Sequence, residues 1–231
     1  MADRYVEAAA WIVQASAGGG DSETARSVGA DADALANKIL ELRPADKMAL
    51  YGQAVILSNL TAVATDDMRP LEAIEMSRGA IAAQKKLVAF DPGNTVARNN
   101  VAAALSGLSD AQWSVGRIQD SIRTWEEAVD SMRLAAKGAA GFKLGKVQYL
   151  WLLGKRRAEA GEYAAIPKIS QEMVETTRII RANVPKESTL PLWAQSATIG
   201  LPSMVALMRN DPQETLRLAR EMLPLIESAT V

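Results

Sequence analysis

Apolar side chains recur along most of the chain with the period of an α-helix. The clearest stripe steps by 4, 3, 4 and 3 residues through Ile118, Ile122, Trp125, Val129 and Met132. Stripes of similar spacing begin at Val28 and Ile166. The strict alternation of apolar and polar residues that is typical of a half-buried strand is not found. We therefore expect an all-α protein.

Glycines, prolines and short polar runs divide this helical pattern into ten segments. The expected helices cover roughly 3–16, 22–42, 45–65, 69–90, 94–115, 117–137, 140–160, 162–183, 188–209 and 211–228. A helix of about 20 residues is about 30 Å long. Because the connections are short, neighbouring helices must run antiparallel, which predicts five helical hairpins.

The turn inside each hairpin recurs at a nearly fixed spacing. The turn positions are Gly20, Met68, Gly116, Gly161 and Asn210, spaced by 48, 48, 45 and 49 residues. Glycine and asparagine tolerate the left-handed backbone that often ends a helix. Five residues after each turn position lies a mostly small residue, suited to a close helix crossing: Ala25, Ala73, Ser121, Ile166 and Thr215.

A repeat of about 48 residues predicts a solenoid, because a single hairpin cannot bury its apolar face alone. We expect one domain over 1–231 with units at about 1–43, 44–91, 92–138, 139–184 and 185–231.

Short motifs at these turns resemble the tetratricopeptide repeat (TPR). Leu153-Gly154 followed by Gly161-Glu162-Tyr163 is similar to the family's first helix and turn, and Asp91-Pro92-Gly93-Asn94 resembles its link between repeats. The family's unit has 34 residues, so each helix here would carry about two additional turns. The resemblance implies a right-handed α-solenoid whose concave face is lined by the first helix of each hairpin.

The composition excludes several kinds of chemistry. The chain has no His and no Cys, which excludes a His/Cys metal site, a Ser-His-Asp triad, a cysteine nucleophile and a disulfide. The net charge of −1 argues against nucleic-acid binding, which needs a basic face. We expect no enzyme activity, no catalytic residue, no metal and no cofactor.

The acidic clusters and the glycine run have structural interpretations. Glu126, Glu127 and Asp130 are expected to face water on one helix, and the Asp66-Asp67 pair is expected to form a turn rather than a metal site. Residues 18–20 are all glycine but lack the Lys-Ser/Thr of a phosphate loop, so we expect a turn capped by the residue at 21 or 22.

A basic run, Lys155-Arg156-Arg157, follows Lys143 and Lys146 on one expected helix. It would suit an acidic peptide or a carboxylate. The alternative is that these cations pair with the nearby Glu159 and Glu162.

Four of the five tryptophans, at 11, 113, 151 and 193, lie on first helices, whereas Trp125 lies on an apolar stripe and is expected in the core. By resemblance, the positions facing the groove include Gln14, Ser58, Asp110, Trp113, Gln148, Trp151, Lys155 and Met204. Aromatic and Met side chains exposed there would be efficient binding anchors. The alternative is that Trp113 and Trp151 are packed between hairpins.

Both terminal helices carry apolar residues on more than one face. In the last helix we expect Leu216, Ala219, Leu223 and Ile226 to form the buried stripe, which leaves Leu218, Met222 and Leu225 on the other face. That second face would dock on a dimer partner or on another domain.

The sequence shows neither a signal peptide nor an uninterrupted apolar run of membrane-spanning length, and we expect a cytoplasmic location. The function these observations favour is a non-enzymatic module that binds a protein or peptide segment in its groove. The alternative is a sensory or regulatory arm of a larger bacterial enzyme, such as a kinase or a nucleotide cyclase.

Overall fold

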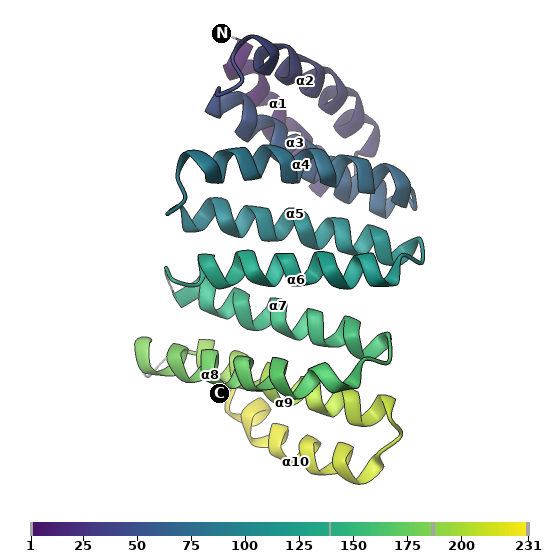
Figure 1. Ribbon diagram of the computed structural model, residues 1–231, viewed down its shortest axis with the longest axis vertical. Helices are drawn as coiled ribbons and strands as arrows, with labels where there is room; N and C mark the ends of the chain where they lie inside the picture. The colour runs from purple at the N-terminus through teal and green to yellow at the C-terminus, as the bar shows by residue number, and fades with distance from the viewer. Residues whose placement is uncertain (1, 139, 186–187, 230–231) are drawn as a thin grey trace. The chain divides into compact units, whose positions relative to one another are not determined.

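The computed structural model describes residues 2–138, 140–185 and 188–229, and within them the chain is entirely helical. Figure 1 shows the α-helices, with no strand among the described residues. The helices are α1 (Ala2–Gly18), α2 (Ser22–Leu42), α3 (Lys47–Asp66), α4 (Pro70–Phe90), α5 (Thr95–Ser114), α6 (Ile118–Ala135), α7 (Ala140–Glu159), α8 (Ile166–Asn183), α9 (Leu190–Met208) and α10 (Pro212–Ala229). The all-α class and the ten expected helices are confirmed for these residues.

Side-chain caps explain several of the helix starts. Asp21, Asp46 and Asn94 each accept a hydrogen bond from the backbone N–H three residues on, at 3.1, 3.0 and 2.9 Å. The expected helix over 162–183 begins later than predicted. A short 3₁₀ turn (Tyr163–Ala165) precedes α8, whose first turn carries Pro167.

All five predicted turn positions have a left-handed backbone. The φ angle is 79° at Gly20, 57° at Met68, 75° at Gly116, 80° at Gly161 and 54° at Asn210. In every case the N–H of the following residue donates to a carbonyl five residues before it, at 2.7–2.9 Å. This bond closes the first helix of each hairpin by a Schellman motif. The five turns therefore share one backbone conformation, including the turn at which the residue is a methionine.

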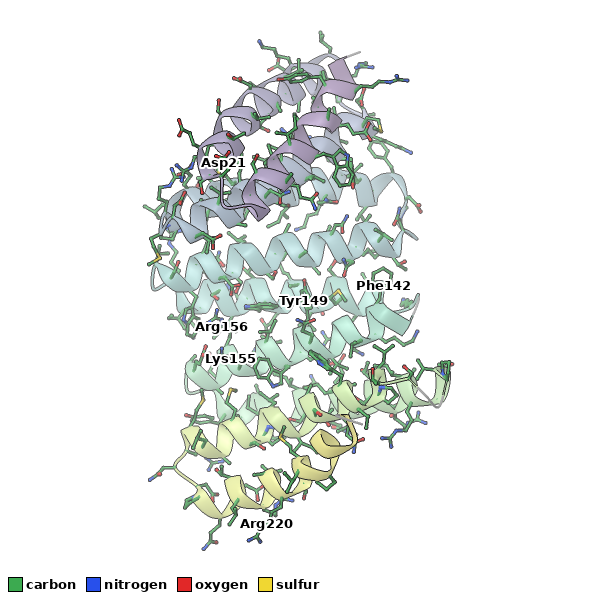
Figure 2. The ribbon with its side chains drawn as sticks, turned by 180° about the vertical axis from the view of Figure 1, so that it is seen from behind. Asp21, Phe142, Tyr149, Lys155, Arg156 and Arg220 are labelled. Carbon is green, nitrogen blue, oxygen red and sulfur yellow. The ribbon has the colours of Figure 1, made fainter. Side chains whose placement is uncertain are left out.

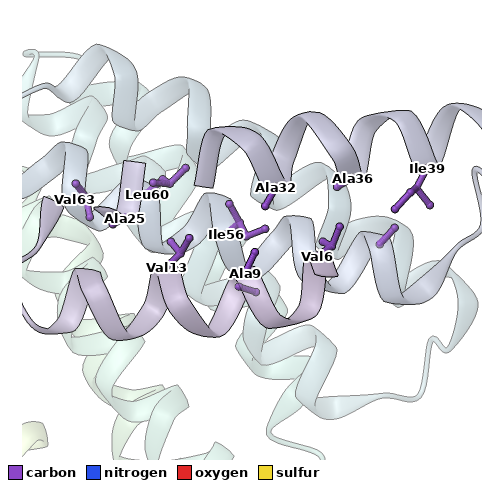
Figure 3. Packing of buried hydrophobic residues seen from close by; sticks show 12 residues of the cluster. Val6, Ala9, Val13, Ala25, Ala32, Ala36, Ile39, Ile56, Leu60 and Val63 are labelled. Atoms are coloured by element: carbon purple, nitrogen blue, oxygen red, sulfur yellow. The ribbon is translucent and has the colours of Figure 1, made fainter. Parts of the chain in front are cut away.

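The helices form two compact units, Met1–Ala128 and Val129–Val231, with the boundary inside α6. In the first unit α3 packs against α1, α2 and α4, and α4 packs against α5. The core between α1, α2 and α3 is built from alanine, valine, isoleucine and leucine (Figure 3). A Cβ at Gly52 would lie 2.5 Å from Val6 Cγ1, so α1 and α3 approach closely there. Trp125, at 2% exposed, lies in the core as predicted.

In the second unit α7 packs against α8 and α9, and α9 packs against α10. An ion-pair cluster joins the last part of α6 to α7 and α8. Arg133 donates two hydrogen bonds to Glu172, at 2.9 and 2.6 Å, and Lys146 Nζ lies 3.0 Å from the same carboxylate. These cations lower the pKa of Glu172 from 4.5 to about 2, mainly through the hydrogen bonds from Arg133.

Among the described helices, α3 is long and apolar enough to cross a membrane by length and composition alone. Half of its most apolar window is buried inside the protein. Its contacts with α1, α2 and α4 account for that apolar character as packing in the first unit.

The predicted orientation of the last helix is wrong. Leu218 is buried in α10 and Met222 is half-buried, whereas Leu216 and Leu223 are 53% and 56% exposed. Ala219 is exposed with them. Leu225 and Ile226 lie outside the described side chains. α10 therefore packs on α9 through the face assigned to an external partner, and it leaves the expected core stripe open.

Candidate binding site

An apolar pocket of about 390 Å³ lies in the second unit, between α7, α9 and α10. Its lining residues are Gln148, Trp151 and Leu152 from α7, Trp193, Ser196, Ala197 and Gly200 from α9, and Met222 from α10. The Trp151 indole is half-buried in the wall, and Trp193 is 55% exposed. The volume falls in the range of small-ligand clefts, about 300–1,000 Å³.

Glycines fix the distance between the walls of this pocket. A Cβ at Gly154 would lie 2.5 Å from Leu201 Cδ2, so the fully buried Leu201 side chain occupies the space above the α7 backbone. At Gly200 a Cβ would lie 3.7 Å from Trp151 Nε1, which places the indole against the open backbone of α9. Small residues on α9 therefore create the hollow that the two tryptophans border.

The polar groups of the lining are few. Ser196 Oγ donates to Leu192 O of its own helix at 3.0 Å, which leaves a mainly apolar wall on that side. Gln148 is exposed at the rim, and its amide makes no hydrogen bond to any described residue. An exposed carboxamide can both donate to and accept from a peptide backbone.

Cations lie one helical turn beyond the pocket. Lys155 follows Trp151 by four residues and Leu152 by three, so all three share one side of α7. Figure 2 shows Phe142, Tyr149 and Lys155 spread in order along this helix. Lys155 Nζ lies 3.8 Å from Glu159, the longest of the three contacts in the basic run.

The other two cations of the run are held more closely. Arg156 lies 3.1 Å from Glu159, and Arg157 lies 2.6 Å from Glu162. The ion pairs that were the alternative interpretation of the basic run are therefore present, with Lys155 the most loosely held. On α9 the sequence from Leu190 to Met208 carries no charge.

The eight predicted groove residues divide between the two units. In the first unit Gln14, Ser58 and Asp110 are exposed and Trp113 is half-buried, on α1, α3 and α5. In the second unit Gln148 and Trp151 line the pocket and Lys155 lies beside it. Met204 is half-buried on α9, outside the lining.

The sequence indicates Trp193 only as a tryptophan on a first helix. Leu152, Ser196, Ala197 and Gly200 are not indicated by the sequence, and Met222 is indicated only as part of the second face of the last helix. Apart from the aromatic side chain of Trp193, these residues carry no chemical signal that marks a site.

The described residues hold no group of three or more His, Cys, Asp or Glu side chains placed to bind a metal. Asp67 directly follows α3, in the predicted turn, where it pairs with Arg26 and lies 3.4 Å from Arg69. Glu127 and Asp130 are exposed, and Glu126 is half-buried.

Comparisons with known proteins agree on the fold. Two crystal structures of nearly identical TPR-like repeats, from a Podosopora anserina protein assigned as a kinesin light chain, match almost the whole chain. One, a point variant, has a TM-score of 0.69 at 14% identity and covers 99% of this chain and 97% of its own. The other has a TM-score of 0.63 at 13% identity, with coverage of 99% and 98%.

No protein-family model matches the chain, and neither does any curated protein. The class of protein is nevertheless defined: this is a TPR-like helical-repeat protein, as the turn motifs indicated.

Proposed function

We propose that the chain is a non-enzymatic protein-interaction module that binds a peptide segment on the first helices of its hairpins. The observation that carries the proposal is the pocket between Trp151 and Trp193, with Lys155 one turn away. A bulky apolar side chain of the partner enters the pocket, and an acidic residue next to it pairs with Lys155. The rim amide of Gln148 binds the partner's backbone.

The walls of the pocket are mainly aromatic and apolar. Buried aromatic side chains dominate the binding energy of many interfaces, surrounded by contacts that exclude water. Trp151 is held in place by α9, so little conformational freedom is lost when a ligand contacts it. Lys155 is bound only loosely to Glu159, so a carboxylate from a partner displaces a weak contact.

The other unit has its own candidate residues on first helices, where Gln14, Ser58 and Asp110 are exposed and Trp113 is half-buried. These residues suit a polar rim more than an anchor, apart from Trp113.

Selection from a random peptide library tests this function, and it works whether or not the natural partner has been identified. We expect the selected peptides to share a Leu, Met or aromatic residue close to an Asp or Glu. Trp151→Ala should weaken their binding by about thirtyfold, the loss typical of an interface hot spot. Lys155→Glu should weaken it about fivefold to tenfold by charge reversal.

The matched control is Trp11→Ala, which removes a tryptophan that is 59% exposed in the other unit. This variant should bind the peptides as the wild type does. Peptides with no common apolar residue, or full binding by a still-helical Trp151→Ala variant, would refute the proposed pocket.

A further inference from the structure

The first helix carries an apolar stripe that faces away from its core. Tyr5 and Ile12 are 52% and 48% exposed, and Ala8 and Ala15 are exposed with them. These four residues, spaced by 3, 4 and 3, form one face of α1, which we call the outer face of α1. Val6, Ala9 and Val13 form the buried face, about a third of a turn away.

The repeat shows what covers this face elsewhere in the chain. The equivalent positions 48 residues later in α3 are Gln53, Ile56, Leu60 and Val63, of which the last three are buried. Two of the four, Leu60 and Gln53, contact α2, the second helix of the preceding hairpin. A Cβ at Gly29 would lie 2.9 Å from Leu60 Cδ1, and Gln53 Nε2 donates to Asp33 Oδ1 at 2.9 Å.

The last helix carries the matching half of such a contact. Leu216, Ala219 and Leu223, the outer face of α10, are all exposed. Their equivalents 190 residues earlier in α2 are Arg26, Gly29 and Asp33, two of which contact α3 as described above. In α4 the equivalent residues are Ile74, Ser77 and Ile81, and all three are buried.

A hollow of about 260 Å³ adjoins the outer face of α10. Its lining includes Leu207, Thr215, Leu216 and Ala219. The equivalents of Leu207 and Thr215 in the first hairpin are Ala17 and Ala25, which belong to the core that also contains Leu60. The hollow is therefore open at the place where, at the end of the first hairpin, the Leu60 side chain of the following first helix is buried.

From this correspondence we propose that a second copy of the chain docks the outer face of its α1 on the outer face of α10. The contact repeats the α2–α3 interface between molecules. Ile12, the equivalent of Leu60, enters the hollow beside Ala219. Tyr5 meets Leu223, at the positions where Gln53 and Asp33 pair within the chain.

The chemistry of the two faces favours this occupant. Where the internal interface has the polar pair Gln53 and Asp33, the two outer faces have Tyr5 and Leu223. Both side chains are large and mainly apolar, so burying them against each other removes apolar surface from water. The two faces differ, so the contact is heterologous, and each copy keeps one face available for a further copy. The inference is independent of the peptide pocket, which uses other residues of α7, α9 and α10.

Sedimentation velocity of the 231-residue chain, from micromolar to submillimolar concentration, tests the proposal. We expect the average mass to rise with concentration beyond that of a dimer. Ile12→Glu and Leu216→Glu should each weaken self-association at least about a hundredfold, because an unpaired charge is buried. The control is Leu71→Glu, at a leucine that is 63% exposed on α4 and outside both faces, which should associate as the wild type does.

Mixing the two variants separates this arrangement from a symmetric dimer. Each variant retains one intact face, and the two intact faces are complementary, so an equimolar mixture should form a dimer and stop there. A wild type that stays monomeric, a mixture that stays monomeric, or one variant that dimerises alone would overturn the proposal. Tyr5→Lys and Leu223→Lys provide a second pair, and circular dichroism verifies that every variant is helical.

Discussion

The left-handed turn at Met68 predicts that replacing this methionine with glycine stabilises the protein. Met68 has a φ of 57°, in the same turn position where Gly20, Gly116 and Gly161 occur. A left-handed backbone costs a residue with a Cβ roughly 1–2 kcal/mol. Met68 is 85% exposed, so removing its side chain loses little buried surface.

The gain is reduced by the greater freedom of glycine in the unfolded chain, about 0.5–1 kcal/mol. Met68→Gly should therefore raise the free energy of unfolding by about 0.5–1 kcal/mol. Gly116→Ala should lower it by a similar amount, about 0.5–1 kcal/mol. Beyond the adjoining residues, no described atom lies within 4 Å of a Cβ built at Gly116, so this loss comes from the backbone conformation alone.

Urea denaturation followed by circular dichroism measures both effects, because a change in midpoint at constant slope reports stability. The control is Ala62→Gly, at an exposed position inside α3, where glycine should cost about 1 kcal/mol. A destabilised Met68→Gly variant, or a Gly116→Ala variant as stable as the wild type, would refute the argument that backbone conformation selects these residues.

Two further predictions concern the second unit. Because the pKa of Glu172 is about 2 in the folded protein and 4.5 ordinarily, its ionised form stabilises the fold above pH 4.5, and this contribution is lost as the pH falls toward 2. Glu172→Gln should lower the free energy of unfolding at pH 7 by roughly 2 kcal/mol, and that free energy should then depend less on pH between 4.5 and 2. Urea midpoints measured at several pH values test this. The same pH dependence in the variant and the wild type would contradict it. Gly154→Ala should cost about 1–3 kcal/mol by crowding Leu201, and a neutral thermal midpoint would contradict that close approach.

The helices and their turns were predictable because their signals are local. A left-handed backbone at the end of a helix selects glycine or asparagine, and four of the five turn positions carry one. Their spacing then located Met68, which no residue preference would have indicated. Caps such as Asp21 and proline at helix starts set the boundaries to within a few residues.

The orientation of α10 was not predictable from its period. Leu216, Ala219 and Leu223 form one apolar stripe, and Leu218 with Met222 forms a second one a third of a turn away. Period alone does not tell which stripe faces α9. The pocket was found only in part for a related reason, since Gly200 and Ala197 act by leaving space, and an absent side chain is not a chemical signal.

The most direct test of the central claim is hydrogen–deuterium exchange with a peptide selected from the library. The proposed function predicts that the bound peptide slows exchange in α7 from Gln148 to Lys155 and in α9 from Trp193 to Gly200. Exchange in α8, a second helix, should change little. Protection confined to second helices, with α7 and α9 unaffected at saturation, would contradict binding on the first helices.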